Sequence, residues 1–366
     1  MKIDIRDRIL KAFTTSNGLV SLVAVILGFL LATILVLAVG RNPGGMYAAI
    51  LQVLTGFNID RGIWNPRYIG EWIVSSMPLI LCGFSMGFAA RAGLFNIGAE
   101  GQLVVGLTAA QFVALFGPQI TGIHWFLAVV AAALAGALWG SLSGFLKARY
   151  SVSEVVSTIM MNYIALYASR ALTMLIPGSN TYRTPAFPET ALLRSDLLAS
   201  ITNGSRLSYG LWITIFCIIF YYIVMEKTRY GFALRATGFN KDAARYAGIH
   251  VNSSITVSMA ISGAFAGIGG AVVALGAFNY GRVLAAQEGY GFDGIAVALV
   301  GNSGAWGTAI SGLLFGMLKS AQPLMQSRQI PKEIASIILG LVVVIISLRS
   351  AVQMLADWQN KKRMAQ

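Results

Sequence analysis

Long apolar runs alternate with short polar segments along almost the whole chain. Most of the runs are long enough to cross about 30 Å of hydrocarbon as a helix. They cover residues 19–40, 72–90, 102–117, 124–146, 155–176, 209–225, 254–278, 292–301, 306–321 and 333–355, and the shorter runs 292–301 and 306–321 are separated by NSGAW. The pattern predicts an all-α, polytopic integral membrane protein with about ten transmembrane helices, some of them short or broken.

Composition supports the same class of protein. Of the 366 residues 56% are hydrophobic and only 11% are charged, with a mean hydropathy of +0.70, whereas soluble domains are about a quarter charged. A signal peptide is the alternative interpretation of the first run, which follows MKIDIRDRILKAF. The run is long for a signal peptide and AVGRNPGG is a poor cleavage site, so we favour a retained span. We therefore expect one membrane-spanning domain over residues 1–366.

Basic residues account for the net charge of +13, and they gather in short segments between the apolar runs. This distribution indicates membrane topology and not a nucleic-acid partner. The clusters lie near the N-terminus, at 147–149, at 227–245 and at 361–363. With ten spans all four fall on one side, which places both termini in the cytoplasm. The segments 41–71 and 177–208 are then external, and their proline, glycine and asparagine predict folded loops.

Small residues and segment order point to internal organisation. Segments 72–166 and 254–349 show a comparable series of runs and interruptions, which suggests an internal repeat. Glycines four residues apart place small residues on one helix face, where neighbouring helices can approach closely. Such pairs or rows are Gly83 and Gly87, Gly136 to Gly144, Gly263 and Gly267, and Gly312 and Gly316.

Several kinds of chemistry are missing from the sequence. It has no Gly-x-x-x-x-Gly-Lys-Ser/Thr loop, so an ATP site of that type is not expected. His124 and His250 have no partner at metal-ligand spacing, and Cys82 and Cys217 lie inside apolar runs, where a disulfide is not implied. No catalytic motif is present. We expect no enzymatic activity, and no metal or cofactor bound by this chain.

The stretch RAGLFNIGAEGQLVVG (91–106) brings polar residues between two apolar runs. Gly98 and Gly101 favour a helix break, and broken helices are tolerated in membranes where they face protein or an aqueous cavity. Glu100 and Asp293 are ionisable residues at membrane depth, where such residues usually line a bundle interior or a water-filled path. In the alternative interpretation, Glu100 caps a half-helix. We favour the solute path.

The segment EKTRYGFALRATGFNKDAARYAGIHVNS (226–253) is a second unusual stretch. Its periodicity predicts two short helices joined by TGFN, with an apolar stripe and no core of its own. A partner protein could cover this stripe, whereas a solvated basic loop held by anionic lipid is the alternative. The stripe consists of Phe232, Ala233, Ala236, Ala243, Ala244 and Ala247.

Three parts of the sequence carry a resemblance to a known family. They are RAGLFNIGAEGQLVVG, then VVSTIMMNYIALY at 155–167, and then TRYGFALRATGFNKDAARYAGI with ISGAFAGIGGA through GYGFDGIAVALVG. Over residues 72–321 the chain resembles bacterial ABC-importer permeases of the branched-chain amino acid and simple-sugar superfamily. It is most similar to those that import nucleosides such as guanosine or uridine.

The resemblance implies a fold, partners and a location. The fold would be similar to that of the cobalamin-importer permeases, in the bacterial cell membrane. Partners would be an ABC ATPase subunit that binds ATP and Mg, a second and unlike permease chain, and an extracytoplasmic substrate-binding lipoprotein. Segment 226–253 would dock on the ATPase, and the residues that we expect to carry this coupling are Arg229, Gly231, Arg235, Gly238, Asn240, Ala243, Ala244 and Gly248.

The resemblance also implies a nucleoside path. Amide and aromatic side chains suit a flat base and ribose hydroxyls, although amides also bridge helices in lipid. The candidates, headed by Asn96 and Glu100, are Phe95, Asn96, Glu100, Gln102, Asn162, Tyr163 and Asp293. One rival is a permease for sugars or branched-chain amino acids. Another is an ion-coupled secondary carrier, against which the ATPase-docking segment argues.

Overall fold

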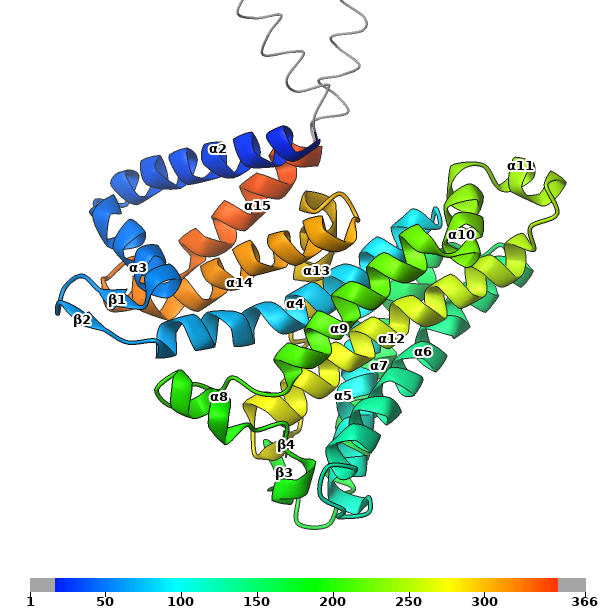
Figure 1. Cartoon of the computed structure of the whole chain (residues 1–366), viewed down its shortest axis with the longest axis horizontal. Coiled ribbons are helices and arrows are strands. Elements are labelled where there is room, and N and C mark those ends of the chain that lie inside the picture. The colour runs from blue at the N-terminus through cyan, green and yellow to red at the C-terminus, as the bar shows by residue number, and fades with distance from the viewer. Residues whose placement is uncertain (1–16, 348–366) are drawn as a thin grey trace, which may run out of the picture. The chain divides into compact units, whose positions relative to one another are not determined.

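The chain is mostly helical, as the apolar runs predict. The computed structural model describes residues 17–347 and divides them into two compact units (Figure 1). The first unit contains residues up to 51 and those from 318 onward, and the second contains residues 52–317. The basic clusters at the two chain ends, and the part of the predicted span 333–355 beyond residue 347, lie outside the described residues.

The first unit is built on two apolar helices, α2 (Asn17–Ala38) and α15 (Glu333–Ser347). A Cβ atom added to Gly28 would lie 2.8 Å from a methyl carbon of Val342, so the absence of a side chain lets the two helices approach. The division between the units falls within α3 (Pro43–Thr55) and α14 (Ala305–Ser327). The sequence predicted only a folded loop where α3 forms.

The second unit contains the longest helices. They are α4 (Arg67–Arg91), α5 (Ala99–Phe116), α6 (His124–Tyr150), α7 (Glu154–Met174), α9 (Gly210–Tyr222), which continues as a π-helical segment (Ile223–Lys227), and α12 (Val251–Ala277). The shorter elements are β1 (Phe57–Asn58), β2 (Ile63–Trp64), β3 (Arg183–Ala186), a 3₁₀ turn (Glu189–Ala191), α8 (Asp196–Ile201), α10 (Arg229–Phe239), α11 (Lys241–Tyr246), β4 (Tyr280–Arg282) and α13 (Tyr290–Val300). The strands form two antiparallel pairs, β1 with β2 and β3 with β4.

All ten predicted apolar runs form helices within the described range 17–347. Five helical segments there are long and apolar enough to cross a membrane, namely α4, α5, α6, α9 with its π-helical continuation, and α12. Three shorter apolar helical stretches are Val23–Ala38, Tyr290–Val300 and Glu333–Ile345. The chain is therefore polytopic, and a total of ten spans stays a prediction.

The helix α12 lies at the centre of the second unit, where it packs against α4, α5 and α6 (Figure 1). Glycine rows make this packing close. An added Cβ at Gly136 would collide with the carbonyl oxygen of Gly263, and one at Gly263 would collide with that of Gly136. One turn further along α12, Gly267 lies against both Gly136 of α6 and Gly106 of α5. The predicted use of these glycines as helix-packing surfaces is confirmed.

The two segments of the suggested repeat contain elements in a similar order. In 72–166 the long helix α4 is followed by a break and then by α5, α6 and α7. In 254–349 the long helix α12 is followed by β4, the short helix α13, and then α14 and α15. A relation by symmetry, and a single domain over 1–366, stay predictions.

Candidate functional site

The predicted helix break lies between α4 and α5 and is held by the side chain of Asn96. The break begins after Arg91, includes Gly93 at a φ of +75°, and ends at Gly98, which precedes α5. Asn96 is fully buried, and its Oδ1 accepts a hydrogen bond from the N–H of Gly98 at 2.9 Å. This bond fixes the turn into α5 in the manner of an Asx turn.

Asn96 also joins a buried polar cluster, which consists of Ser85, Asn96, Gln102 and Ser262. Its Nδ2 lies 2.9 Å from Oε1 of Gln102 and 2.6 Å from Oγ of Ser262. Ser85 lies 3.1 Å from the same Nδ2 and 3.2 Å from Oε1 of Gln102. The cluster connects α4, the break, α5 and α12, so these amides satisfy one another and hold four parts of the chain together.

Asn162 of α7 binds the backbone at the end of the break and in the first turn of α5. Its Oδ1 accepts from the N–H of Gly101 at 2.8 Å, and its Nδ2 donates to the carbonyl of Ile97 at 3.0 Å. Gly101 has no side chain where α7 approaches, since an added Cβ would lie 2.8 Å from the Cα of Asn162. A neutral amide thus pairs backbone groups that a regular helix would have paired internally.

Glu100 binds the start of the short helix α13. Its carboxylate accepts the N–H of Gly289 at 2.8 Å and that of Gly291 at 2.7 Å. Gly289 precedes α13 with a φ of +83°, and an added Cβ at Gly291 would collide with the backbone of Glu100. A carboxylate at a helix N-terminus satisfies backbone donors and favours the helix dipole. Glu100 therefore caps a half-helix, as the alternative interpretation stated, and its place in a solute path stays a prediction.

The path candidates differ in how far they are buried. Asn96, Glu100, Gln102 and Asn162 are at most 2% exposed, whereas the side chains of Phe95 and Tyr163 are 38% and 52% exposed. Asp293 is half-buried in the first turn of α13. The structure thus brings four of the seven candidates together around the break, and it leaves two aromatic candidates on the surface of the second unit.

The predicted pair of helices in 226–253 is present as α10 and α11, which we call the coupling segment (229–246). The side chain of Asn240 caps α11 by accepting the N–H groups of Asp242 and Ala243, each at 3.0 Å. The side chain of Thr228 caps α10 through Gly231, at 3.0 Å. The capping side chains of Thr228 and Asn240 therefore define where the two helices begin.

Only part of the predicted apolar stripe is uncovered. Within the stripe, Ala244 is buried, whereas the side chain of Phe232 is 63% exposed; Leu234 of α10, which is not part of the stripe, is also buried. Two aromatic residues outside that stripe are far more exposed, namely Phe239 at 95% and Tyr246 at 97%. Of the other coupling candidates, Arg229 and Ala243 are exposed, and Gly248 has a φ of +81°.

The coupling segment rests on the end of α4, immediately before the helix break. An added Cβ at Gly238 would lie 2.7 Å from the backbone nitrogen of Gly93 and 2.8 Å from the carbonyl carbon of Ala92. Glu226 forms ion pairs with Arg91 at the end of α4 and with Arg235 of α10, the latter at 3.1 Å. Backbone contact and charge together join the coupling segment to the break.

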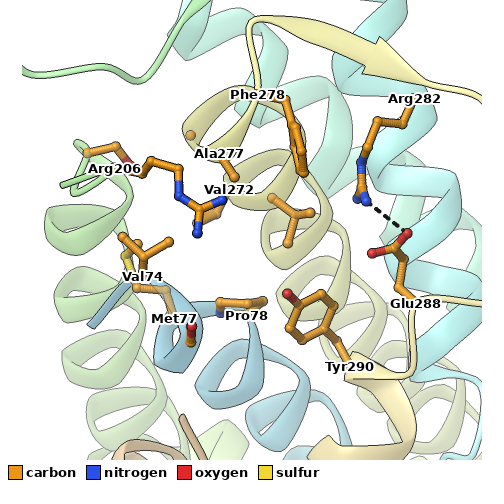
Figure 2. A pocket seen from close by; sticks show the side chains of 14 residues that line it. Val74, Met77, Pro78, Arg206, Val272, Ala277, Phe278, Arg282, Glu288 and Tyr290 are labelled. Atoms are coloured by element: carbon orange, nitrogen blue, oxygen red, sulfur yellow. Dashed lines mark ion pairs between the residues drawn. The ribbon is translucent and has the colours of Figure 1, made fainter. Parts of the chain in front are cut away.

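A cavity of about 100 Å³ lies at the other end of α12 (Figure 2). Phe278, Tyr290 and Pro78 lie around it in the close-up, with Arg206 on the opposite side from the pair Arg282 and Glu288. A second cavity of about 210 Å³ shares the lining residues Arg206, Gly276, Ala277 and Phe278, so the two adjoin.

Sequence reasoning missed the cavity and the ion pairs of Glu226. The cavity residues come from α4, the segment before α9, the end of α12, β4 and the start of α13, so no local motif contains them. One signal was present, since Pro78 inside an apolar helix leaves a backbone carbonyl without its usual donor. The polarity of RVLAAQEGYG (282–291), between two apolar runs, was another.

Comparisons with known proteins agree on the family to which this chain is similar. The family model described as "Branched-chain amino acid transport system / permease component" matches residues 68–347. The chain is 40% identical over 350 residues to the guanosine ABC transporter permease protein NupP of Bacillus subtilis, covering 95% of this chain and 98% of that protein.

Two other relatives are more distant. The chain is 33% identical over 348 residues to the nucleoside ABC transporter permease protein NupB of Lactococcus lactis, covering 93% of each protein. It is 31% identical over 289 residues to the glucose ABC transporter permease protein TsgB13 of Haloferax volcanii, covering 75% of each. No solved structure gives a significant match.

Proposed function

Because the chain belongs to the permease family whose model matches residues 68–347, we propose that it is the permease component of a nucleoside ABC importer. The observation that carries the proposal is near-full-length similarity, at 40% and 33% identity, to two permeases named for guanosine and for nucleosides. A permease of this kind moves its solute without chemical change. The energy comes from ATP that is bound with Mg and hydrolysed by a separate ATPase subunit.

The proposal includes an assembly and an orientation. The chain sits in the bacterial cell membrane with about ten spans, similar to the cobalamin-importer permeases, and both termini are cytoplasmic. It pairs with a second, unlike permease chain. The basic coupling segment lies on the cytoplasmic side, in keeping with the positive-inside rule. The segments 41–71 and 177–208 lie outside and receive the substrate-binding lipoprotein.

The ATPase subunit docks on the coupling segment. Phe239 and Tyr246 support this, because two aromatic side chains that are more than nine-tenths exposed are anchors of the kind that protein interfaces bury. The N-terminal cap of α11 by Asn240 holds Tyr246 on an ordered helix close to Phe239 in the chain.

Movement of the coupling segment is passed to the helix break. Gly238 lies directly against Gly93, and Glu226 ties Arg91 to Arg235, so displacement of α10 pulls on the residues that lead into the break. The break is in turn tied to α7 through Asn162 and to α13 through Glu100. A movement of the ATPase that displaces α10 and α11 would thus be transmitted to α4, α7 and α13.

The solute path runs beside this break. The buried side chains of Asn96, Gln102 and Asn162 hold the shape of the backbone there, since their polar atoms already pair with protein groups. Phe95 and Tyr163 have exposed rings that a flat base can contact. Asp293 and Glu100 belong to α13 and its cap, so they would move with that helix.

Uptake in cells tests the proposal. We expect cells that carry the complete importer to take up labelled guanosine, uridine or adenosine, and cells lacking this gene to lose that uptake. Unlabelled nucleosides should compete, whereas ribose, glucose and leucine should not. Unchanged nucleoside uptake in a strain without a second route would contradict the proposal. Uptake that persists without the ATPase and collapses with an uncoupler would favour a secondary carrier.

A further inference from the structure

The cavities at the end of α12 occupy a particular place in the proposed importer. They adjoin the C-terminal residues Gly276 and Ala277, whereas the coupling segment precedes Val251 at the other end of the helix. A helix of 27 residues is about 40 Å long. If the coupling segment is cytoplasmic, the cavities open toward the extracytoplasmic face, where the lipoprotein would release the solute.

Three arginines line the two cavities, and each is paired with a carboxylate: the exposed Arg194 lies 3.4 Å from Asp196, and the other two are Arg206 and Arg282. Arg206 binds Glu71 through Nε at 3.0 Å and Nη2 at 2.6 Å, and Glu71 also accepts the N–H of Arg206 at 3.0 Å. The hydrogen bonds that Arg206 donates to Glu71 raise the pKa of Arg206, so this guanidinium stays charged and its charge is balanced by the carboxylate. Arg282 pairs with Glu288 at 3.1 Å. The lining is polar but balanced in charge, which suits an uncharged polar solute better than an anion.

The ion pair of Arg282 with Glu288 leaves two donors of its guanidinium without a partner among the described residues. Within residues 17–347, Nε and Nη2 of Arg282 are buried without a hydrogen-bond partner. The guanidinium carbon lies 4.4 Å from the ring centroid of Phe278, a cation–π contact that fixes both groups. Unpaired guanidinium donors beside an aromatic ring match a flat heterocycle that carries carbonyl acceptors.

The combined size of the two cavities also fits a nucleoside. A cavity of about 100 Å³ is small for a nucleoside, but together with the adjoining cavity of about 210 Å³ it reaches the lower end of the range for small-ligand sites. Arg206 and Phe278 line both cavities and so lie where base and ribose would meet. Tyr290 lies on the other side of the smaller cavity from Phe278 (Figure 2).

Glu100 connects this cavity to the helix break. The two N–H groups that it binds belong to Gly289 and Gly291, the neighbours of Tyr290. Glu288, which lines the cavity, lies one residue earlier. Movement of the break would therefore move Tyr290 and Glu288, and with them the shape of the cavity.

We infer that these two cavities form an extracytoplasmic entrance site for an uncharged nucleoside. The base stacks against Phe278 and Tyr290, and Arg282 donates to carbonyl groups of the base. This inference rests on the proposed function and adds a place and a preference: the site accepts nucleosides and discriminates against nucleotides, because no positive charge in the lining is left without a carboxylate.

Photoaffinity labelling of the complete permease and ATPase complex in nanodiscs tests the site. The probe is an azido-substituted guanosine, applied without ATP, and the labelled peptides are identified by mass spectrometry. We expect labelling within the cavity lining, at 272–290 or 204–208, and competition by guanosine but not by guanosine monophosphate. Stacking of a base on an aromatic ring corresponds to roughly 5- to 150-fold in affinity. Phe278→Ala should therefore reduce labelling at low probe concentration by at least about fivefold.

The controls separate the possible failures. Phe278→Tyr keeps the ring and should restore labelling, and Phe116→Ala changes an exposed aromatic residue outside the cavity lining and should have no effect. Copurification of the ATPase checks assembly of each variant. Labelling outside the cavities, labelling unaffected by Phe278→Ala in an assembled complex, or equal competition by the monophosphate would overturn the entrance site. Absence of nucleoside uptake by the unmodified importer would instead overturn the proposed function.

Discussion

Replacing Glu100 tests how strongly one buried carboxylate holds the short helix α13. Its two oxygens accept the N–H groups of Gly289 and Gly291 at 2.8 and 2.7 Å, and no part of its side chain is exposed. Glu100→Ala leaves two buried donors unpaired, and each such group costs about 1–3 kcal/mol. We expect a total loss of about 3–5 kcal/mol, similar to that from breaking a buried charged pair.

The variant Glu100→Gln should lie between the two. An amide offers one carbonyl oxygen, so it can accept one of the two N–H groups, while its own NH₂ group faces the other. The expected loss is about half of that for alanine. Glu189→Gln is the matched control, because Glu189 is an exposed glutamate in the 3₁₀ turn outside the long helices.

Amide hydrogen exchange of the purified complex gives the most direct measurement. A loss of about 1–3 kcal/mol at one N–H group corresponds to roughly 5- to 150-fold faster exchange through local opening. The acceleration should be confined to peptides that contain 288–300, and it should be larger for alanine than for glutamine. Unchanged exchange at Gly289 and Gly291 in Glu100→Ala would refute the capping role. Faster exchange with unchanged uptake would confirm the capping role of Glu100 but show that transport does not depend on it.

Three substitutions test the coupling segment in the same complex. Gly238→Ala drives a Cβ atom into the backbone of Arg91 to Gly93, which cannot rotate away as a side chain could, so we expect lost uptake with the ATPase still bound; full uptake would contradict the contact. The double change of Phe239 and Tyr246 to alanine should weaken copurification of the ATPase at least tenfold while the unfolding midpoint stays within about 1 °C, and equal copurification would argue against docking there. Glu226→Gln removes both ion pairs, which are partly exposed and contribute at most about 1 kcal/mol to stability. The unfolding midpoint should therefore stay the same, while the amount of solute transported per ATP hydrolysed falls. An unchanged amount of solute per ATP would exclude Glu226 from the transmission of movement.

The helical framework could be predicted because a span in lipid must be both long and apolar. Most of the ten apolar runs met this description, and each of the ten forms a helix within residues 17–347. The helix α3 was not predicted, because its sequence PGGMYAAILQVLT is short and begins with proline and two glycines, which are common in loops. The apolar residues Met46, Ala49 and Val53 stand at a helical spacing, which was the signal that could have identified it, and all three are buried.

The surroundings of the polar residues could be predicted only in part. The residues FNIGAEGQ indicated a helix break and a capping carboxylate, since short-range chemistry determines where a helix stops and starts. The groups that Glu100 caps lie 189 and 191 positions later in the chain, and Asn96 meets Ser262 across 166 positions. No local pattern specifies such partners. The cavity was missed for the same reason, because five separate segments supply its lining.

The distribution of polar atoms suits a protein that must release its solute. Around the break, the amides of Asn96, Gln102 and Asn162 pair with protein groups, so they have little left with which to hold a nucleoside. At the end of α12, by contrast, Arg282 keeps two donors unpaired beside an aromatic ring. A solute would then be oriented at the entrance and bound only weakly beyond it. Because the ATPase supplies the work, a deep binding site along the path would slow transport without making it more favourable.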